Sequence, residues 1–483
     1  MDTATPFLRS PPFPWVPAAT AAVSAPGRST LGDGPALLDA IRRARIGGAF
    51  WSEADDPWQA QAAVRVDHPG ADRAIAAWLN GAGVLDGAGG VVSDDVLRIA
   101  ALDRLASASY RDPFTGRAAD PVTVVAILAD WRRSLDANRP VVAAAGMAQW
   151  KREAIGQFLW DGENTPAFVS AERVPIGGGA IAYWPSRVPS NFAARVGGGA
   201  WAVEDGFIRS SGLGAECRPP MSILVDRSGG IYFDPARPSE LETILATHVF
   251  DAPLVARARA LRQTIVGSRL GKYGVDRPGP AMDLPGDRPL VLAIGQVDDD
   301  LSVVHGGAGV VGNARFLDRV RAEEPGAYIL YRPHPDVAAG LRRGRIADPV
   351  ASGLADRVVA GGSLFDLIER CDAVHVLSSL TGFEALLRGR RVTVHGVPFY
   401  AGWGLTRDLA RIPERRSRRL SLDELVAGAL ILAPRYRDPV TLLPCTAEIL
   451  VERLAAARPQ STLVTSFRRA WGAGRRIAGR GRA

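Results

Sequence analysis

The sequence predicts an α/β protein with two doubly wound domains in series, and three observations support this. The chain has 483 residues, of which 47% are apolar, so it can bury more than one core. Between residues 139 and 410, short β-like runs alternate with helical patterns. Acidic and glycine-rich motifs directly follow several of these runs, and open α/β sheets bind their ligands at such strand ends.

Changes in composition and periodicity divide the chain into six expected parts. Residues 1–34 are rich in Pro, Ala and Ser, and we expect a disordered leader because prolines interrupt the apolar helix that a secretion signal needs. The parts that follow are a helical segment at 35–138, a first α/β domain at 139–286, a second at 287–410, C-terminal helices at 411–465 and a basic tail at 466–483.

The periodicity places strands and helices within both α/β domains. In the first, strands are expected in the runs that begin at Pro140, Pro166, Ala180 and Ala200, and the first crossover helix begins near Met147. In the second, strands are expected in the runs that begin at Arg288, Ala327, Arg357 and Ala373, with helices at 314–323 and 364–370 between them. This interleaving predicts a parallel sheet.

A short pattern occurs on each side of the α/β domains. Tyr110-Arg-Asp-Pro-Phe-Thr and Tyr436-Arg-Asp-Pro-Val-Thr each lie between two helical patterns. We interpret residues 35–138 as the remnant of a preceding module that ended in the same way. The alternative is a pair of unrelated helix–proline–helix corners.

Composition excludes several classes of protein. Cys217, Cys371 and Cys445 lie far apart and form no C-x-x-C pattern, so we expect neither a disulfide framework nor a cysteine zinc site. The longest uncharged apolar stretches, such as 122–129 and 427–434, are much shorter than the roughly 20 residues that a membrane helix needs. We therefore expect a cytoplasmic protein that does not cross a membrane.

An acidic pair at 204–205 ends an expected strand of the first domain. Glu204 and Asp205 would lie at the carboxyl edge of the sheet, Gly206 would let a substrate approach the backbone, and Arg209 would hold an anion or one of the carboxylates. The alternative interpretation of these residues is an acidic turn that contains a structural ion pair.

Asp298, Asp299 and Asp300 follow the first strand of the second domain. Three adjacent carboxylates repel one another, so at least one should carry a raised pKa or need a cation, as catalytic carboxylates do. A solvated acidic loop is the alternative. A metal site is less favoured, because no matching acidic partner occurs at EF-hand spacing.

Two further motifs predict an anion-binding corner. Arg332 and His334 alternate with Pro333 and Pro335 directly after a strand, and we expect a rigid cationic corner there. Ser378, Ser379 and Thr381 occupy a strand-to-helix junction, where hydroxyls and free backbone N–H groups can bind phosphate. A histidine beside a proline is often structural, but the two motifs together favour function.

Motifs of other enzyme classes are missing from the sequence. There is no G-x-x-x-x-G-K-[ST] loop, no G-x-G-x-x-G loop before a helix and neither a G-x-S-x-G nor an H-E-x-x-H motif. ATP-, NAD- and hydrolase-type functions are thereby disfavoured. Acids in one domain and a phosphate corner in the other indicate a glycosyltransferase that uses a sugar nucleotide.

Six motifs together resemble the KpsC family of capsule polysaccharide biosynthesis proteins, from about residue 110 to 455. They lie at 150–152, 204–210, 295–300, 332–337, 378–387 and 398–406. The resemblance implies a GT-B-like fold with two Rossmann-like domains that face a central cleft. It also implies retaining transfer of β-Kdo from CMP-β-Kdo, at the inner face of the inner membrane, to a poly-Kdo linker on lyso-phosphatidylglycerol.

Residue roles follow from this resemblance. Asp300 would be the nucleophile, Asp299 the second candidate, and either Glu204 or Asp205 the acid/base group. The donor would be bound by Gln296, Arg332, His334, Pro335, Ser378, Ser379, Thr381 and Glu384, the last at its ribose. Arg209 and Lys272 would position the substrates. No metal or cofactor is expected, and the sequence leaves open which of residues 298–300 faces the donor.

The chain departs from the family pattern in having one complete module where many members carry two. The linkage that it makes therefore stays open, and a separate protein of capsule biosynthesis is a candidate for the other linkage. Transfer of another CMP-activated nonulosonic acid is the alternative within the enzyme class. A non-catalytic scaffold of capsule assembly is the alternative outside it.

Most of the net charge of +7 lies in the tail. Residues 466–483 contain six arginines and no acid, which leaves +1 for the remainder of the chain. Arginines interleaved with Phe467, Trp471 and Ile477 favour contact with an anionic membrane surface, and a solvated tail is the equal alternative. Nucleic-acid binding is less favoured because no basic stripe accompanies the tail.

Deletion of residues 466–483 tests the membrane interpretation. We expect the truncated protein to bind anionic liposomes more weakly, because six arginines and three apolar side chains are lost, and to keep its activity on a soluble acceptor. Liposome co-sedimentation measures the first effect. Equal binding by both proteins would favour the solvated tail.

Overall fold

The computed structural model describes residues 5–457, apart from 61, 176, 210–217, 273 and 280–281. The basic tail and part of the glycine-rich stretch after Arg209 lie outside these residues. The chain forms two compact units. Unit 1 comprises Met1–Ala144, Lys151–Phe168 and Tyr436–Ile449, and unit 2 comprises Ala145–Trp150, Val169–Arg435 and Leu450–Ala483.

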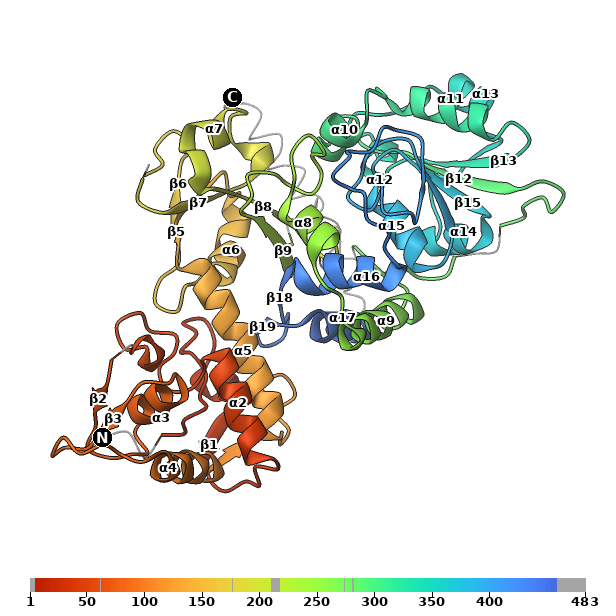
Figure 1. The fold of residues 1–483 in the computed structure, drawn as a ribbon. Helices are drawn as coiled ribbons and strands as arrows, with labels where there is room; N and C mark the ends of the chain where they lie inside the picture. The colour runs from red at the N-terminus through yellow and green to blue at the C-terminus, as the bar shows by residue number, and fades with distance from the viewer. Residues whose placement is uncertain are drawn as a thin grey trace. The chain divides into compact units, whose positions relative to one another are not determined.

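The elements of the first 170 residues are mostly helices with short strands (Figure 1). The helices are α1 (Ala18–Ala21), α2 (Gly34–Ala44), η1 (Pro57–Gln59), α3 (Asp72–Leu79), α4 (Asp94–Ala106), α5 (Pro121–Asn138), η2 (Gln149–Lys151) and α6 (Arg152–Phe158). The strands are β1 (Ser24–Pro26), β2 (Val64–Arg65), β3 (Val84–Leu85), β4 (Ala108–Tyr110), β5 (Val141–Ala145) and β6 (Ala167–Val169).

Local sequence explains where the main helices of unit 1 begin. Asp33 accepts the Ala36 N–H at 3.0 Å, and Asp120 accepts the Thr123 N–H at 2.8 Å. A proline follows within the first turn in both cases, where its missing N–H has no cost. These caps fix the starts of α2 and α5, whose apolar faces enter one core.

The expected disordered leader is wrong for residues 5–26. Phe7, Leu8 and Phe13 are buried in the core of unit 1, and the Phe13 ring lies 5.1 Å from that of Trp131. Strand β1 also pairs antiparallel with β4. Apolar residues set between prolines follow neither a helical nor a strand period, so the sequence gives no sign that they will be buried.

The two copies of the repeated motif form the same loop. The carboxylate of each aspartate accepts the N–H groups of the residues two and three positions later. Two backbone hydrogen bonds close each loop. In the first loop, the Asp112 N–H donates to the Arg117 carbonyl at 2.9 Å and the Gly116 N–H donates to the Asp112 carbonyl at 2.8 Å. In the second loop, the Asp438 N–H donates to the Leu443 carbonyl and the Leu442 N–H donates to the Asp438 carbonyl, both at 2.9 Å. The two copies of the sequence motif therefore adopt the same loop conformation. The derivation of residues 35–138 from a preceding module stays a prediction.

The remaining elements build the larger unit and the C-terminal part of the chain. The strands are β7 (Ala180–Tyr183), β8 (Ala200–Asp205), β9 (Ser222–Asp226), β10 (Leu270–Gly271), β11 (Gly274–Val275), β12 (Leu290–Ile294), β13 (Tyr328–Arg332), β14 (Arg357–Val358), β15 (Ala373–Val376), β16 (Arg391–Val394), β17 (Arg407–Asp408), β18 (Arg435–Arg437) and β19 (Pro444–Cys445).

The helices of this part begin after Tyr183. They are η3 (Pro185–Arg187), α7 (Phe192–Val196), η4 (Gly197–Gly199), α8 (Glu240–Thr247), α9 (Ala252–Gly267), α10 (Leu301–Gly306), α11 (Asn313–Glu323), α12 (Pro335–Ala338), α13 (Asp348–Leu354), α14 (Leu364–Arg370), α15 (Leu380–Leu387), α16 (Leu422–Val426), a π-helical turn (Ala427–Leu432) and α17 (Ala447–Ala456). None of the helices in the described part of the chain has the length and apolar character that crossing a membrane requires.

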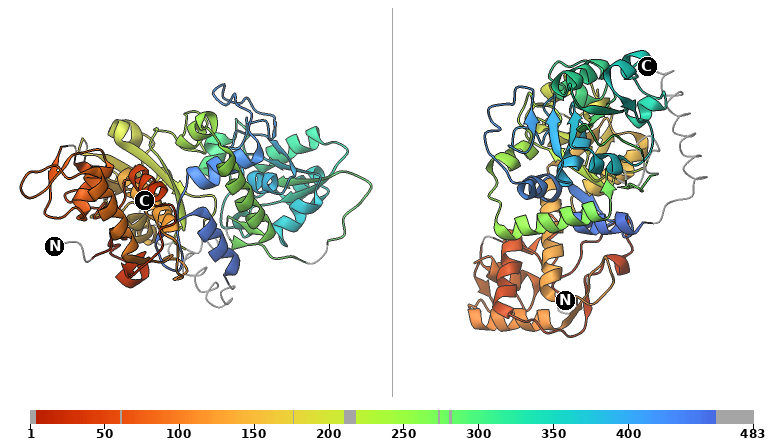
Figure 2. Two further views of the ribbon diagram at one scale, coloured as in Figure 1. Left: turned by 60° about the horizontal axis from the view of Figure 1, so that its bottom comes forward. Right: turned by 90° about the vertical axis from the view of Figure 1, so that its right-hand side faces the viewer.

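A six-stranded parallel sheet organises the second half of unit 2. Its order is β14-β13-β12-β15-β16-β17, and its strands lie side by side in the right-hand view of Figure 2. Helices α11 and α13 cover one face, and α14 and α15 cover the other (Figure 1). The expected α/β fold with a parallel sheet is confirmed. Register pairs Ile294 with both Arg332 and Val376, so the ends of β12, β13 and β15 meet at one edge.

The strands of the first half of unit 2 are mixed in direction. Strand β7 pairs parallel with β8, whereas β9 runs antiparallel to β8 with Glu204 opposite Leu224. The doubly wound arrangement expected here therefore does not extend to β9.

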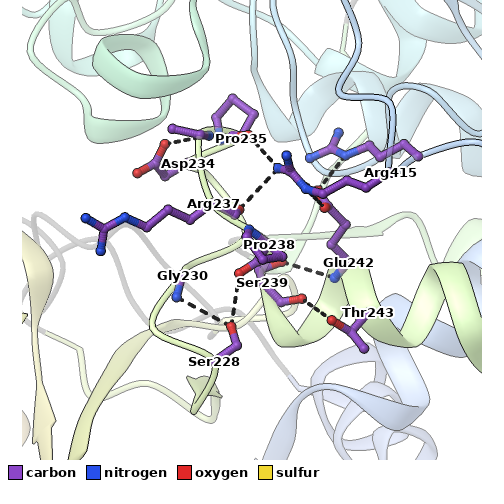
Figure 3. Close-up of polar contacts among 12 residues, drawn as sticks. Ser228, Gly230, Asp234, Pro235, Arg237, Pro238, Ser239, Glu242, Thr243 and Arg415 are labelled. Atoms are coloured by element: carbon purple, nitrogen blue, oxygen red, sulfur yellow. Dashed lines mark hydrogen bonds and ion pairs between the residues drawn. The ribbon is translucent and has the colours of Figure 1, made fainter. Parts of the chain in front are cut away.

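A buried carboxylate fastens helix α8 to two loops of unit 2. Glu242 accepts hydrogen bonds from Arg415 and Arg416, and its side chain is only 6% exposed. Arg415 also donates to the carbonyls of Pro235 and Arg237 (Figure 3). Arg416 donates to the carbonyl of Pro398 at 2.7 Å. This network ties the loop between β9 and α8 to the segment around residue 398.

Glu242→Gln tests this network. The substitution leaves two guanidinium groups without a counter-charge, and breaking a buried pair in this way costs about 3–5 kcal/mol, so we expect a large fall in the free energy of unfolding. Glu240→Gln is the matched control on the same helix, because the side chains of Glu240 and Arg227 are 29% and 47% exposed, against 6% for Glu242, and pairs that water reaches contribute at most about 1 kcal/mol. Urea denaturation of both variants measures the difference, and equal losses would contradict the interpretation.

Candidate active site

A buried amide network joins the strand ends of the six-stranded sheet. Gln296, which follows β12, accepts the Ser378 N–H at 2.8 Å and donates from Nε2 to the Ser378 hydroxyl at 3.2 Å. Asn313 Oδ1 accepts the Gln296 N–H at 2.8 Å, and its Nδ2 donates to the carbonyls of Gln296 (2.7 Å) and Gly344 (2.8 Å). Gln296, Asn313 and Ser378 are all buried. Four chain segments are thereby fixed around one edge of the sheet.

The three adjacent aspartates have three different environments. Asp300 caps α10, because its Oδ1 accepts the N–H and the hydroxyl of Ser302 at 2.9 and 2.7 Å. Asp299 pairs with Arg342 at 2.9 Å, and this hydrogen bond lowers the pKa of Asp299. Burial raises the pKa of Asp298, and the charge of Asp299 adds to that effect. The expected mutual repulsion is thus reduced by one ion pair and one helix cap.

In the Arg-Pro-His-Pro corner, both basic side chains already make hydrogen bonds to the backbone. Arg332 donates to the carbonyls of Gly361 and Gly362, both at 2.8 Å. His334 caps α12, and its Nδ1 accepts the Asp336 N–H at 3.1 Å. Pro335 supplies the first residue of that helix, where proline is well suited. Burial lowers the pKa of His334, so the ring is neutral at pH 7. The expectation of a cationic corner is therefore corrected for His334.

The Ser-Ser-x-Thr motif begins helix α15. The hydroxyl of Ser379 accepts the Thr381 N–H at 3.2 Å, which caps the helix beside Ser378. Further along this helix, the buried Oε1 of Glu384 accepts the Lys272 N–H at 3.0 Å. Burial raises the pKa of Glu384. The donor-binding residues expected on α15 therefore lie on one short helix next to the Gln296 network.

Lys272 connects this helix to the acidic motif at the end of β8. The Lys272 carbonyl accepts the Arg209 N–H at 3.1 Å, and Arg209 Nε donates to Asp205 at 2.7 Å. Glu204 Oε1 accepts the Asp205 N–H at 3.0 Å. Arg209 is almost fully buried, and its guanidinium also lies 5.9 Å from the Trp150 ring centroid. The predicted Asp205–Arg209 pair therefore exists and is held in place.

An aromatic cluster packs the same two motifs together. The Phe207 ring, from the acidic motif, stacks on Phe399 with 4.3 Å between centroids. Phe383 of α15 lies 5.3 Å from Phe399, and Tyr232 lies 5.0 Å from Phe207. Phe207, Phe383 and Phe399 are buried, so this cluster holds the 204–209 motif against the elements that carry the serine motif.

The structure adds two residues that the sequence analysis did not select. Asn313 starts α11 directly after a glycine, and this helix-start pattern was the only signal for it. Arg342 lies eight residues after His334 in an Arg-Arg-Gly stretch, which reads as a solvated loop from sequence alone. Within the described residues, no group of three His, Cys, Asp or Glu side chains is arranged to hold a metal ion.

Comparison with known proteins identifies the family. The family model described as "Capsule polysaccharide biosynthesis protein" matches residues 180–274 and 272–436, which is more than half of the chain. The chain belongs to this family. The resemblance to KpsC proteins predicted from the motifs is thereby confirmed.

Two curated relatives show how far the similarity extends. The capsule polysaccharide modification protein LipA of Neisseria meningitidis serogroup A is 38% identical over 374 residues, which cover 74% of this chain and 52% of LipA. The lipopolysaccharide-processing protein LpsZ of Rhizobium meliloti is 40% identical over 313 residues, 62% of this chain and 70% of LpsZ. The chain thus spans about half the length of LipA.

Two solved structures share the fold. They are described as Thermosulfurimonas dismutans KpsC, beta Kdo 2,7 transferase, and Thermosulfurimonas dismutans KpsC, beta Kdo 2,4 transferase. Each structure is 31% identical in sequence to this chain, and the match covers 65% of this chain and 98% of the solved chain. The TM-score is 0.54 for the 2,7 transferase and 0.56 for the 2,4 transferase. The similarity therefore includes nearly the whole of both transferase structures.

The neutral state of His334 predicts a pH dependence of stability. The pKa of His334 is lower in the folded chain than the ordinary value of 6.5, so the unfolded chain takes up the proton first as the pH falls, and stability decreases below about pH 6.5. His334→Asn keeps a side-chain cap for α12 and removes this titration. We expect the variant to lose less unfolding free energy than the wild type between pH 7.5 and 5.5.

Comparing the wild type with His334→Asn removes the contribution of the other histidines to the pH dependence of stability. His375 and His395 are buried, with pKa values lowered to about 4 and about 3, and both contribute equally to the wild type and the variant. Urea denaturation at the two pH values gives the difference. An identical pH dependence in both proteins would show that His334 is not held neutral.

Proposed function

We propose that this chain is a retaining β-Kdo transferase with a GT-B-like fold, in which two Rossmann-like domains face a central cleft. Its donor would be CMP-β-Kdo, and its acceptor the poly-Kdo linker on a lyso-phosphatidylglycerol terminus. Membership of the capsule biosynthesis family and the 31% identity to two KpsC structures described as β-Kdo transferases support this proposal.

The observation that carries the proposal is the convergence of the motifs on one edge of the parallel sheet. Gln296, His334 and Ser378 follow β12, β13 and β15, whose ends are in register. Parallel sheets bind nucleotides at this edge. The acidic motif of β8 is joined to α15 through Arg209 and Lys272, so both halves of the reaction have side chains in one connected region.

Retention fits two successive displacements at the anomeric carbon of Kdo. In the first, the Asp300 carboxylate forms a bond to this carbon while the bond to the CMP phosphate breaks and CMP leaves. In the second, Glu204 or Asp205 removes the proton from the acceptor hydroxyl, whose oxygen displaces Asp300. Two inversions give net retention. We keep Asp299 as the second candidate for the nucleophile.

The proposed donor site requires only residues of this chain. The helix start at Ser379 and the Nε2 of His334 would donate to the phosphate, and Glu384 would contact the ribose. No metal or cofactor is part of the proposal. The chain would work at the inner face of the inner membrane, bound there through its basic tail, alongside other proteins of capsule biosynthesis.

A coupled assay that generates CMP-β-Kdo in place tests this function. With a synthetic acceptor that ends in β-Kdo, we expect a product one Kdo heavier, and NMR of its anomeric centre reports the linkage and its position. A protein that binds CMP but transfers only another nonulosonic acid would support the alternative donor. A folded protein that does not bind CMP would support a scaffold role instead.

Asp300→Asn and Asp299→Asn compare the two candidate nucleophiles. Asparagine still caps α10, so Asp300→Asn removes the nucleophile without unfolding the helix. We expect its kcat to fall at least about a hundredfold with CMP binding retained, whereas the kcat of Asp299→Asn should stay within about tenfold of the wild-type value. A third variant, His334→Ala, should mainly raise KM for the donor. The reverse order of the two aspartate variants would move the nucleophile to Asp299.

A further inference from the structure

The donor corner of the candidate site offers few free positive charges to the carboxylate of an acidic sugar. Asp298, Asp299 and Asp300 are three carboxylates in one turn, and the substrates proposed above carry a sugar carboxylate in addition to phosphate. Arg332 is engaged by two carbonyls, and His334 is neutral. A binding site for a carboxylate in the donor corner therefore needs a cation other than Arg332 and His334.

Arg342 is placed to supply this charge. Its guanidinium lies 2.9 Å from Asp299, and its backbone N–H donates at 3.1 Å to the carbonyl of Asp336, two residues after His334. The side chain of Arg342 is 36% exposed, so a ligand can reach it.

The backbone on both sides of Arg342 is held firmly. The Leu341 and Arg342 N–H groups donate to the Asp336 carbonyl at 2.8 and 3.1 Å. The Arg343 carbonyl accepts the Asp298 N–H at 3.2 Å, and the Gly344 carbonyl accepts from Asn313. An accessible guanidinium on a fixed backbone is preorganised for binding, because little freedom is lost when a ligand arrives.

We propose that Arg342 binds the carboxylate of the ulosonic acid sugar, exchanging Asp299 for the substrate. This inference rests on the proposed function, since that function supplies the acidic sugar. A guanidinium can hold a carboxylate through two parallel hydrogen bonds, which lysine cannot do. The exchange has a small cost because Asp299 is 57% exposed and returns to water.

Arg345 provides a matched control on the same loop. Its side chain is 77% exposed and lies 3.7 Å from Asp348, whose side chain is 84% exposed. Arg342→Gln and Arg345→Gln remove the same charge from positions three residues apart. Only the first is expected to affect substrate binding.

Steady-state kinetics of the two variants with donor and acceptor varied separately test the proposal. We expect Arg342→Gln to raise KM about tenfold or more for the substrate whose carboxylate is bound, with Arg342→Lys intermediate and Arg345→Gln unchanged. An effect on the donor KM assigns the carboxylate to the donor, and an effect on the acceptor KM assigns it to the acceptor. The Kd for CMP alone should change less than twofold. Unchanged KM values for both substrates, or an equally weakened Kd for CMP, would overturn the proposal.

A binding experiment separates this inference from the proposed reaction. The methyl β-glycoside of Kdo and its methyl ester are titrated into the full chain in the presence of CMP. If the wild type transfers no Kdo but binds the free acid at least tenfold more tightly than the ester, and Arg342→Gln abolishes that preference, the reaction fails and the inference stands. If the wild type does not distinguish acid from ester, the inference is wrong whatever the activity.

Discussion

The geometry of the candidate site depends on the buried side chain of Gln296. Its amide satisfies the Ser378 N–H and hydroxyl, and its backbone is satisfied in turn by Asn313, which also holds Gly344. Buried polar groups without partners are costly, so such a network has few alternative arrangements. The acidic turn, the start of α15 and the loop that carries Arg342 are therefore positioned together rather than one at a time.

Burial, more than residue type, decides which side chains of this region can carry charge. His334 is neutral because its ring is buried and its Nδ1 serves as a helix cap. Arg332 is charged but is used to hold residues 361 and 362. Arg342, by contrast, keeps an accessible guanidinium whose partner is itself exposed. For an anionic substrate, this distribution matters more than the number of basic residues in the motif.

The acidic motif at the end of β8 is held mainly by aromatic packing. Phe207 and Phe399 stack in a buried cluster, and the adjoining Asp205–Arg209 pair is linked through Lys272 to Glu384. Apolar packing thus sets the distance between the two motifs, while hydrogen bonds orient the side chains. The Tyr-Arg-Asp-Pro loop occurs twice, with matching backbone hydrogen bonds at Asp112 and Asp438.

The sequence by itself determined strands β12, β13, β14 and β15 of the parallel sheet, the family and the motif residues at the strand ends, but it did not predict β16 and β17. Each of these depends on a local pattern, and Asp300, His334 and Ser379 all follow strands that were expected from the sequence. Tertiary structure alone decided the rest. The burial of Phe7 and Phe13, the antiparallel return of β9, the neutral state of His334 and the pairing of Asp299 with Arg342 depend on contacts between distant segments. Desolvation and ion pairing arise only when the chain is folded, so no local pattern encodes them.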